Sequence, residues 1–118
     1  MRSLQLKVTA AVLIVMSSVA AGQTTYTCSG VPRGVSMGAS GTLTVESLGG
    51  LTWPYLCSVD GAQNGISPGA CKAIYAGLLA AQASGRSVTI WFTNSASTCA
   101  ANPAWAWALG AYLWRFDN

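Results

Sequence analysis

Four cysteines are the residues of this 118-residue sequence best suited to chemistry, and they lie at Cys28, Cys57, Cys71 and Cys99. An even number of cysteines in a small exported chain is typical of disulfide bonds. A zinc site is the alternative, but no CxxC pair and no histidine are present to supply the usual ligands. A reactive thiol would need an unpaired cysteine or an activating neighbour. We expect two disulfides and no metal or other cofactor, and the spacing leaves all three pairings open.

Groups for catalysis are scarce in the rest of the sequence. Without histidine, no Ser-His or Cys-His nucleophile system can be assembled. The three acidic residues, Glu46, Asp60 and Asp117, are scattered along the chain. A carboxylate pair for glycoside hydrolysis would require two of them to converge. We therefore expect no enzymatic activity and no catalytic residues.

Aromatic residues indicate binding chemistry instead, because the apolar face of a sugar stacks on an aromatic ring. Trp53 and Tyr55 share one face of an expected strand, and Trp91 points away from the apolar face of another. These three residues are the predicted ligand-binding set. The alternative is that such side chains pack in a core or in a subunit interface.

Two strands joined by a turn are expected to carry the first aromatic pair. Residues 41–48 alternate between apolar and polar side chains, as a half-buried strand does. Gly49 and Gly50 suit a tight hairpin turn, because both accept a positive φ. Residues 51–57 form the expected return strand, in which Pro54 predicts an edge position or a bulge because it cannot donate a ladder hydrogen bond.

One helix is expected to follow. Ser67 suits the N-cap, Pro68 the first helical position and Gly85 the C-terminal stop. Apolar residues recur between these ends at helical spacing. The predicted apolar stripe consists of Cys71, Ile74, Tyr75, Leu78 and Leu79.

The opposite face of this helix has small side chains and almost no charge. It is either an ordinary alanine-rich surface, since alanine has the highest helix propensity, or a close contact with a symmetry-related copy. Gly77 favours the contact, because a mid-helix glycine costs about 1 kcal/mol relative to alanine and often has a packing reason. The residues expected at this oligomer contact are Ala73, Ala76, Gly77 and Ala80.

Two more strands are expected after the helix, at residues 87–93 and 109–116. Between them, Asn102 begins an expected short helical turn around Trp105 and Trp107. Strands, one helix and further strands predict a mainly β, α+β domain or a helix-plugged barrel.

The N-terminus has the parts of a secretory signal: early positive charge at Arg2 and Lys7, a short apolar run at residues 8–16 and a small-residue exit. A membrane anchor is the alternative, but this run is shorter than the roughly 20 residues that span a bilayer. We expect residues 1–22 to be a cleaved signal peptide. Residues 23–118 are then a single disulfide-bonded domain, secreted or periplasmic.

The charge of the expected mature chain is small. The sequence has 8% charged residues, against roughly 25% in typical soluble domains. Without Arg2 and Lys7, four basic and three acidic residues remain, a net charge of +1. Since neutralising several phosphates requires a basic stripe, we expect no nucleic-acid partner. We also expect no membrane span after signal cleavage.

The segment from Leu56 to Phe92 reads LCSVDGAQNGISPGACKAIYAGLLAAQASGRSVTIWF. It is similar to small secreted bacterial proteins that resemble the B subunits of subtilase-cytotoxin and typhoid-toxin type. The shared pattern is an aromatic-X-Cys strand end, a loop, a helix, a Ser-Gly turn and a Val-X-Ile strand. The residues that match it are Tyr55, Cys57, Ser84, Gly85, Val88 and Ile90.

This resemblance implies the oligomer-binding (OB) fold, a small five-stranded barrel with a helix between strands three and four. It also implies a pentameric ring that binds glycans or a receptor. No sugar-contacting motif is present between Tyr26 and Ser47, so no ligand residue is carried over. In an OB barrel the first and fourth strands pair antiparallel, and Cys28 is expected before the first strand and Cys99 after the fourth. The resemblance therefore implies the disulfide Cys28–Cys99. It also implies Cys57–Cys71, because Cys57 ends the expected third strand and Cys71 opens the helix that follows.

Three functions follow as hypotheses. The first is a non-catalytic, glycan- or receptor-binding homo-oligomer similar to toxin B subunits. The second is a free-standing secreted protein that binds or inhibits another protein. The third is a structural component of the cell envelope.

Overall fold

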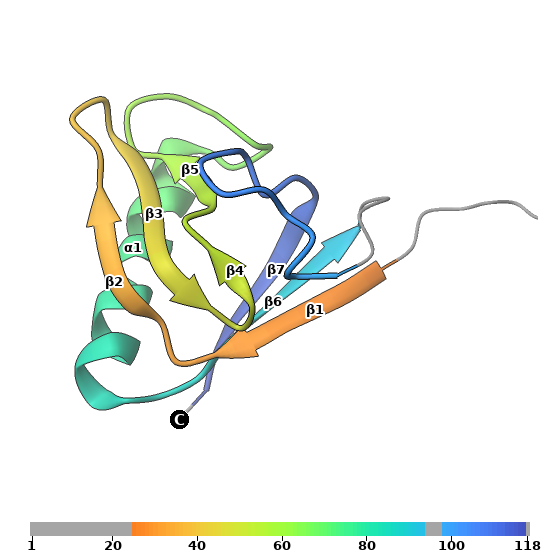
Figure 1. The fold of residues 1–118 in the computed structure, drawn as a ribbon. Helices are drawn as coiled ribbons and strands as arrows, with labels where there is room; N and C mark the ends of the chain where they lie inside the picture. Colours follow the sequence, from red (N-terminus) through yellow and green to blue (C-terminus); the bar gives the residue numbers. More distant parts are fainter. Residues whose placement is uncertain (1–24, 94–97, 118) are drawn as a thin grey trace, which may run out of the picture.

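Strands and one helix make up the computed structural model, which describes residues 25–93 and 98–117 (Figure 1). The prediction of a mainly β chain with one helix is confirmed. The expected signal peptide at residues 1–22 lies outside the described residues. In chain order the elements are β1 (Thr25–Gly30), β2 (Arg33–Met37), β3 (Thr42–Leu48), β4 (Leu51–Thr52), β5 (Tyr55–Ser58), α1 (Pro68–Ser84), β6 (Val88–Thr93) and β7 (Ala111–Phe116).

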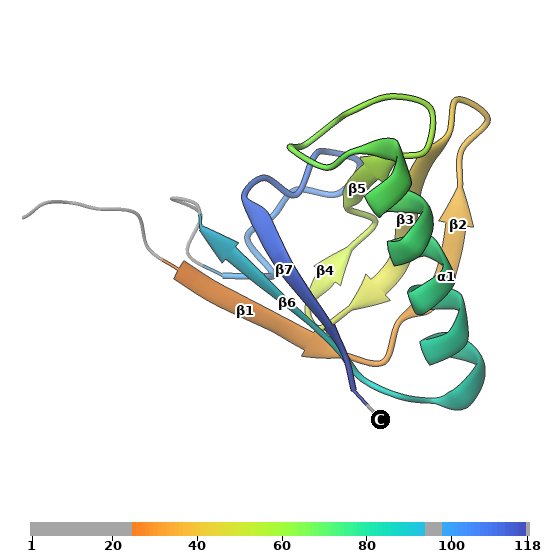
Figure 2. The same cartoon turned by 180° about the vertical axis from the view of Figure 1, so that it is seen from behind.

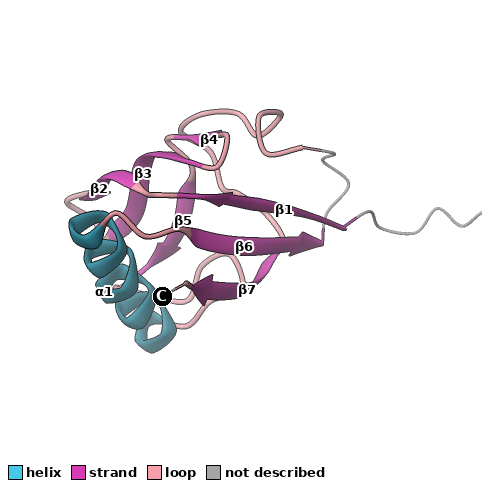
Figure 3. Cartoon of the chain, turned by 90° about the horizontal axis from the view of Figure 1, so that it is seen from below, coloured by secondary structure: helices cyan, strands magenta, loops and turns pink. Residues whose placement is uncertain are grey.

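The described strands form two antiparallel sheets. One has the order β1-β6-β7, and the other places β2 on one side of β3 and both β4 and β5 on its other side. Figure 3 shows β1, β6 and β7 side by side, with α1 at one end of the molecule. Only Val31 and Pro32 separate β1 from β2, so one nearly continuous stretch contributes to both sheets.

The expected return strand at residues 51–57 is interrupted, which confirms the irregularity predicted at Pro54. Trp53 and Pro54 separate β4 from β5, and the pairing with β3 shifts register between Leu43 and Thr44. Pro54 has no N–H to donate, but its carbonyl accepts a hydrogen bond of 2.6 Å from the Thr44 hydroxyl. The buried proline is thus bonded to β3 through its carbonyl instead of through the regular ladder.

The Gly49-Gly50 turn is present as predicted and brings the two sheets together. Both glycines have a positive φ, 57° and 98°, as a tight hairpin turn requires. A Cβ atom on Gly49 would lie 2.5 Å from the backbone nitrogen of Ser29 in β1. The turn therefore packs backbone against backbone on the other sheet.

Helix α1 has the predicted ends. The Ser67 hydroxyl accepts a hydrogen bond from the Ala70 N–H, and Gly85 is left-handed with φ 68°. The helix contacts β2, β5 and β7 and so lies against both sheets (Figure 2). Its buried residues are Cys71, Ile74, Leu78 and Ala81. Leu79, predicted in the apolar stripe, is 38% exposed instead, because it lies about 100° around the helix from Leu78.

Gly77 has a packing partner within its own chain. A Cβ atom at this position would lie 2.6 Å from the ring of Phe116 in β7. The glycine therefore lets α1 and β7 approach each other, which removes the reason to assign it to a contact between copies. Ala73, Ala76 and Ala80 are exposed.

Two disulfides tie these elements together, Cys28–Cys99 and Cys57–Cys71, the pairs that the resemblance implies. Cys28 lies within β1 and not before the first strand as expected. Such bonds persist in oxidising compartments, which fits a protein that works outside the cytoplasm. Within the described residues, no helix is both long and apolar enough to cross a membrane.

Candidate functional site

Four aromatic side chains, which we call the aromatic cluster, lie together: Trp53, Tyr55, Trp105 and Trp107. The rings of Trp53 and Trp105 are stacked, with centroids 4.7 Å apart and an interplanar angle of 13°. The Tyr55 ring contacts the rings of Trp105 and Trp107 edge to face, with centroid distances of 6.4 Å and 5.6 Å. Two pairs that are about fifty residues apart in the sequence thus form one group.

The connection from β6 to β7 brings these pairs together. Residues 98–110, which we call the aromatic loop, pass beside β5 in blue in Figure 1. The Tyr55 N–H donates to the Ala106 carbonyl at 2.9 Å, and the Ala108 N–H donates to the Tyr55 carbonyl at 3.0 Å. Tyr55 and Trp107 form a parallel bridge. The loop therefore extends the sheet beside β5 for a short distance.

Side-chain bonds hold both ends of the aromatic loop. Near its start, Cys99 is bonded to β1, and the Asn102 amide donates to the Tyr26 hydroxyl at 3.0 Å. Near its end, the Asn64 amide donates to the Ala108 carbonyl at 2.8 Å. Side chains thus fix this segment, which has no helix or strand, against β1 and against the loop between β5 and α1.

The backbone of the cluster is strained. Trp53 and Trp105 have positive φ angles of 47° and 60°, a conformation that large side chains rarely adopt. The Trp105 N–H donates to the Trp53 carbonyl at 2.7 Å. Strain of this kind costs about 1–3 kcal/mol per residue and is concentrated at binding and active sites. The strain therefore marks the cluster as a candidate functional site.

A hollow of about 350 Å³ opens beside the cluster, and we call it the aromatic hollow. Three aromatic residues line it, together with residues of β3 and of the turn between β2 and β3. Its lining residues are Gly38, Ser40, Thr42, Thr44, Tyr55, Trp105 and Trp107. These seven side chains are all uncharged.

A second hollow of about 430 Å³ adjoins the first, and we call it the polar hollow. The two hollows share Ser40, Thr42 and Trp107. The remaining lining residues of the polar hollow are Ser58, Asp60, Gly61 and Gln63. Among the described residues that line either hollow, Asp60 alone is charged, so the combined groove is uncharged at one end and acidic at the other.

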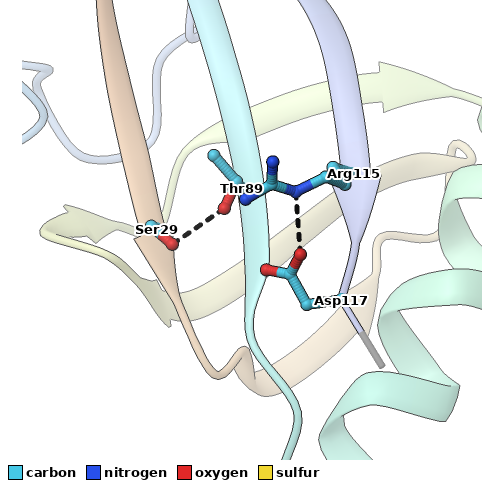
Figure 4. Close-up of polar contacts among 4 residues, drawn as sticks. All are labelled: Ser29, Thr89, Arg115 and Asp117. Carbon is cyan, nitrogen blue, oxygen red and sulfur yellow. Dashed lines mark hydrogen bonds and ion pairs between the residues drawn. The ribbon is translucent and has the colours of Figure 1, made fainter.

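Trp91 lies elsewhere, on the sheet formed by β1, β6 and β7. It is half-buried, and the Arg115 guanidinium carbon lies 5.2 Å from the centre of its ring. Figure 4 shows the polar contacts of this face, Ser29 with Thr89 at 2.8 Å and Arg115 with Asp117 at 2.7 Å. The predicted set of Trp53, Tyr55 and Trp91 is therefore divided between two sheets.

A larger hollow of about 650 Å³ lies between the start of α1 and β7. Tyr112 and Trp114 contribute to its wall, but the described aromatic rings form no cluster there. The nearby Asn64 amide is already bonded to the carbonyls of Leu56 and Ala108. The aromatic hollow is the better candidate site, because the rings that line it belong to a cluster with two strained tryptophans.

The sequence prediction missed Trp105 and Trp107 as site residues and was wrong about a helical turn around them. The described aromatic loop contains turns and an isolated bridge but no helix. The signal for an extended segment was present, since Trp105 and Trp107 alternate with Ala106 and Ala108 at a period of two. Asn102 bonds to Tyr26 instead of capping a helix.

The described acidic residues are spread over the molecule. Glu46 is in β3, and Asp60 lies in the loop between β5 and α1. Asp117 follows β7 and pairs with Arg115. In the part of the chain that the structure describes, no group of three or more His, Cys, Asp or Glu side chains is placed to hold a metal ion.

Comparison of the chain with protein-family models, with curated proteins and with solved structures finds no match.

Proposed function

We propose that the chain is an exported, non-catalytic protein that binds a saccharide in the aromatic hollow. The observation that carries this proposal is the strained aromatic cluster beside a hollow lined by hydroxyl groups. Ligand sites are commonly concave and mostly apolar, with a few polar groups that orient the ligand. The volume of about 350 Å³ lies in the range of such sites.

The lining suits a sugar because a sugar has both apolar C–H faces and polar hydroxyl edges. Trp105 and Trp107 offer aromatic surface for the C–H face. Ser40 and Thr42 offer hydroxyl groups that both donate and accept hydrogen bonds. The Thr44 hydroxyl proton is already used by the Pro54 carbonyl, so Thr44 contributes only acceptor capacity.

We also propose that the two sheets are one five-stranded OB-like barrel, as in the toxin B subunits that the sequence resembles. In this reading, Pro32 interrupts the first strand as β1 and β2, and Pro54 interrupts the third as β4 and β5. The antiparallel pairing of β1 with β6 and the position of α1 between β5 and β6 support it. The bridge between Tyr55 and Trp107 is where the barrel would close.

A homo-oligomer remains part of this proposal. Gly77 no longer supports a helix contact between copies, but Ala73, Ala76 and Ala80 are exposed on α1. Lys72 is the one charged residue of this helix, and so few charges favour burial of the alanine face. The likeness to toxin B subunits adds two further partners to this proposal: a receptor that carries the saccharide, and a separate enzymatic subunit.

The test is a glycan array with the unreduced mature protein, followed by affinity measurements on Trp105→Ala. We expect a bound glycan and an affinity at least about tenfold lower for the variant, as for an aromatic residue that anchors a ligand. Tyr112→Ala is the matched control, because Tyr112 is 53% exposed and Trp105 56%, but Tyr112 lies outside the groove. The control should bind normally. Absence of all glycan binding, or equal affinity of the Trp105 variant, would contradict the proposal.

A further inference from the structure

The polar hollow continues the aromatic hollow along the same surface. Trp107 lines both hollows, as do Ser40 and Thr42. A ring stacked in the aromatic hollow would therefore direct its next unit past Trp107 toward Ser58 and Asp60. The groove has room for more than one sugar unit, because each hollow alone has the volume of a small ligand site.

The polar hollow provides hydrogen-bonding groups with spare capacity. The Ser58 hydroxyl accepts the Asp60 N–H at 3.1 Å, so its own proton stays available for a ligand. Gln63 also lines the hollow, and its backbone is bonded to Ile66 in both directions, which holds the residue in place. These groups match the hydroxyls of a sugar better than an apolar ligand.

Asp60 lines this hollow, and no described lysine or arginine forms an ion pair with its carboxylate. The described pair of Arg115 with Asp117 lies on the other sheet. A Cβ on Gly41 would lie 3.1 Å from the Asp60 Cβ, so the backbone beside Asp60 is closely packed. The carboxylate can accept strong, charge-assisted hydrogen bonds from ligand hydroxyls.

The described lining of both hollows contains no lysine or arginine. Arg33 pairs across from Ser47, whereas the groove lies at the other end of these strands, near Thr42 and Ser58. At about 3.3 Å per residue, Arg33 is roughly 13 Å along β2 from Met37, which precedes the groove. An acidic group on the ligand would thus meet a carboxylate and no compensating cation from these linings.

We propose that the polar hollow is a second subsite, which binds the adjoining unit of an oligosaccharide, and that Asp60 selects units without a carboxylate or sulfate group. This inference rests on the proposed function of the aromatic hollow. The ligand class is a neutral oligosaccharide of two or more units. Sialylated, uronic and sulfated forms bind more weakly.

The test is an array that prints glucose, galactose, mannose and N-acetylglucosamine series as mono-, di- and trisaccharides, each also in sialylated or sulfated form. In the series that binds, we expect the di- or trisaccharide to bind at least about tenfold more tightly than the monosaccharide, and the acidic form about fivefold more weakly than the neutral one. Asp60→Asn should bring the ratio of neutral to acidic binding close to one.

Asp117→Asn is the matched control, since it also removes one negative charge but lies outside the groove. Its neutral-to-acidic ratio should equal that of the unmodified protein. Equal binding of mono- and trisaccharides, or an unchanged ratio in Asp60→Asn while Trp105→Ala still weakens binding, would overturn the second subsite alone. Binding of no saccharide would instead overturn the proposed function.

Discussion

Positive φ angles have different costs for the residues that adopt them. Glycine tolerates this conformation because it has no Cβ, whereas Trp53 and Trp105 adopt it at a cost in free energy. In the two tryptophans the strain is offset by stacking at 4.7 Å and by the hydrogen bond between their backbones. At the scale of single residues, the strained tryptophans therefore point to function and the glycines to packing.

Gly49→Ala tests the packing role of glycine. Gly49 and Gly65 both have a positive φ, 57° and 74°, but of the two only Gly49 faces another backbone. We expect Gly65→Ala to lower the free energy of unfolding by about 1 kcal/mol, the cost of the backbone conformation alone. Gly49→Ala should lower it by about 3 kcal/mol or more, because its Cβ would meet Ser29 at 2.5 Å. Urea denaturation measures both values, and equal losses would mean that the turn and β1 separate easily.

The regular and irregular elements of this chain are held by different means. Helix α1 has local capping bonds at both ends and a disulfide from Cys71 to β5. The aromatic loop has little regular structure and depends on contacts with Tyr26, Tyr55 and Asn64, all distant in sequence. The helix can therefore be predicted from its own residues, but the loop cannot.

Ser67→Ala tests the N-terminal cap of α1. The Ser67 hydroxyl accepts the Ala70 N–H at 3.2 Å, and its loss should lower the free energy of unfolding by about 1 kcal/mol. Ser84→Ala is the control. The Ser84 hydroxyl donates to the Ala80 carbonyl, and the helix does not need this bond to form. The control should be neutral or slightly stabilising in the same thermal or urea denaturation. A larger loss for Ser84→Ala than for Ser67→Ala would refute the capping role.

For the molecule as a whole, the disulfides restrict the unfolded chain to different extents. Cys28–Cys99 joins residues 71 positions apart, and Cys57–Cys71 joins residues 14 positions apart. The first bond also holds the start of the aromatic loop on β1, whereas the second joins β5 to α1. The two bonds therefore differ both in chain entropy and in what they position.

Paired cysteine-to-serine variants separate these effects. Loss of Cys28–Cys99 should cost about 4 kcal/mol and loss of Cys57–Cys71 about 3 kcal/mol, from the chain entropy of the two loop lengths. Only the first loss should also weaken glycan binding at a temperature where both variants stay folded, because only it releases the aromatic loop. Denaturation and array binding are measured on the same samples. Normal binding by the folded Cys28→Ser/Cys99→Ser variant would show that other contacts suffice to hold the loop.

Native mass spectrometry of the unreduced mature protein tests assembly. We expect a closed homo-oligomer, because the chain has few charges and an exposed alanine face on α1. Ala76→Glu should lower the oligomeric state by placing a charge on that face. A monomer across a wide concentration range would reject the helix contact and favour a free-standing binding protein.

Features that depend on neighbouring residues can be read from the sequence alone. The caps at Ser67 and Gly85, the Gly49-Gly50 turn and the interruption at Pro54 were all predictable, because each follows from the backbone chemistry of one or two residues. The mainly β character followed from alternating polarity, which is likewise a local pattern.

How distant segments of the chain meet is visible only in the folded molecule. The fold joins Trp53 and Tyr55 with Trp105 and Trp107, places Trp91 on the other sheet and gives Gly77 a partner in Phe116. Pairing across about fifty residues depends on how the two sheets and the aromatic loop pack, and no local periodicity contains that information. The candidate site is therefore a product of chain packing, although each of its aromatic residues is visible in the sequence.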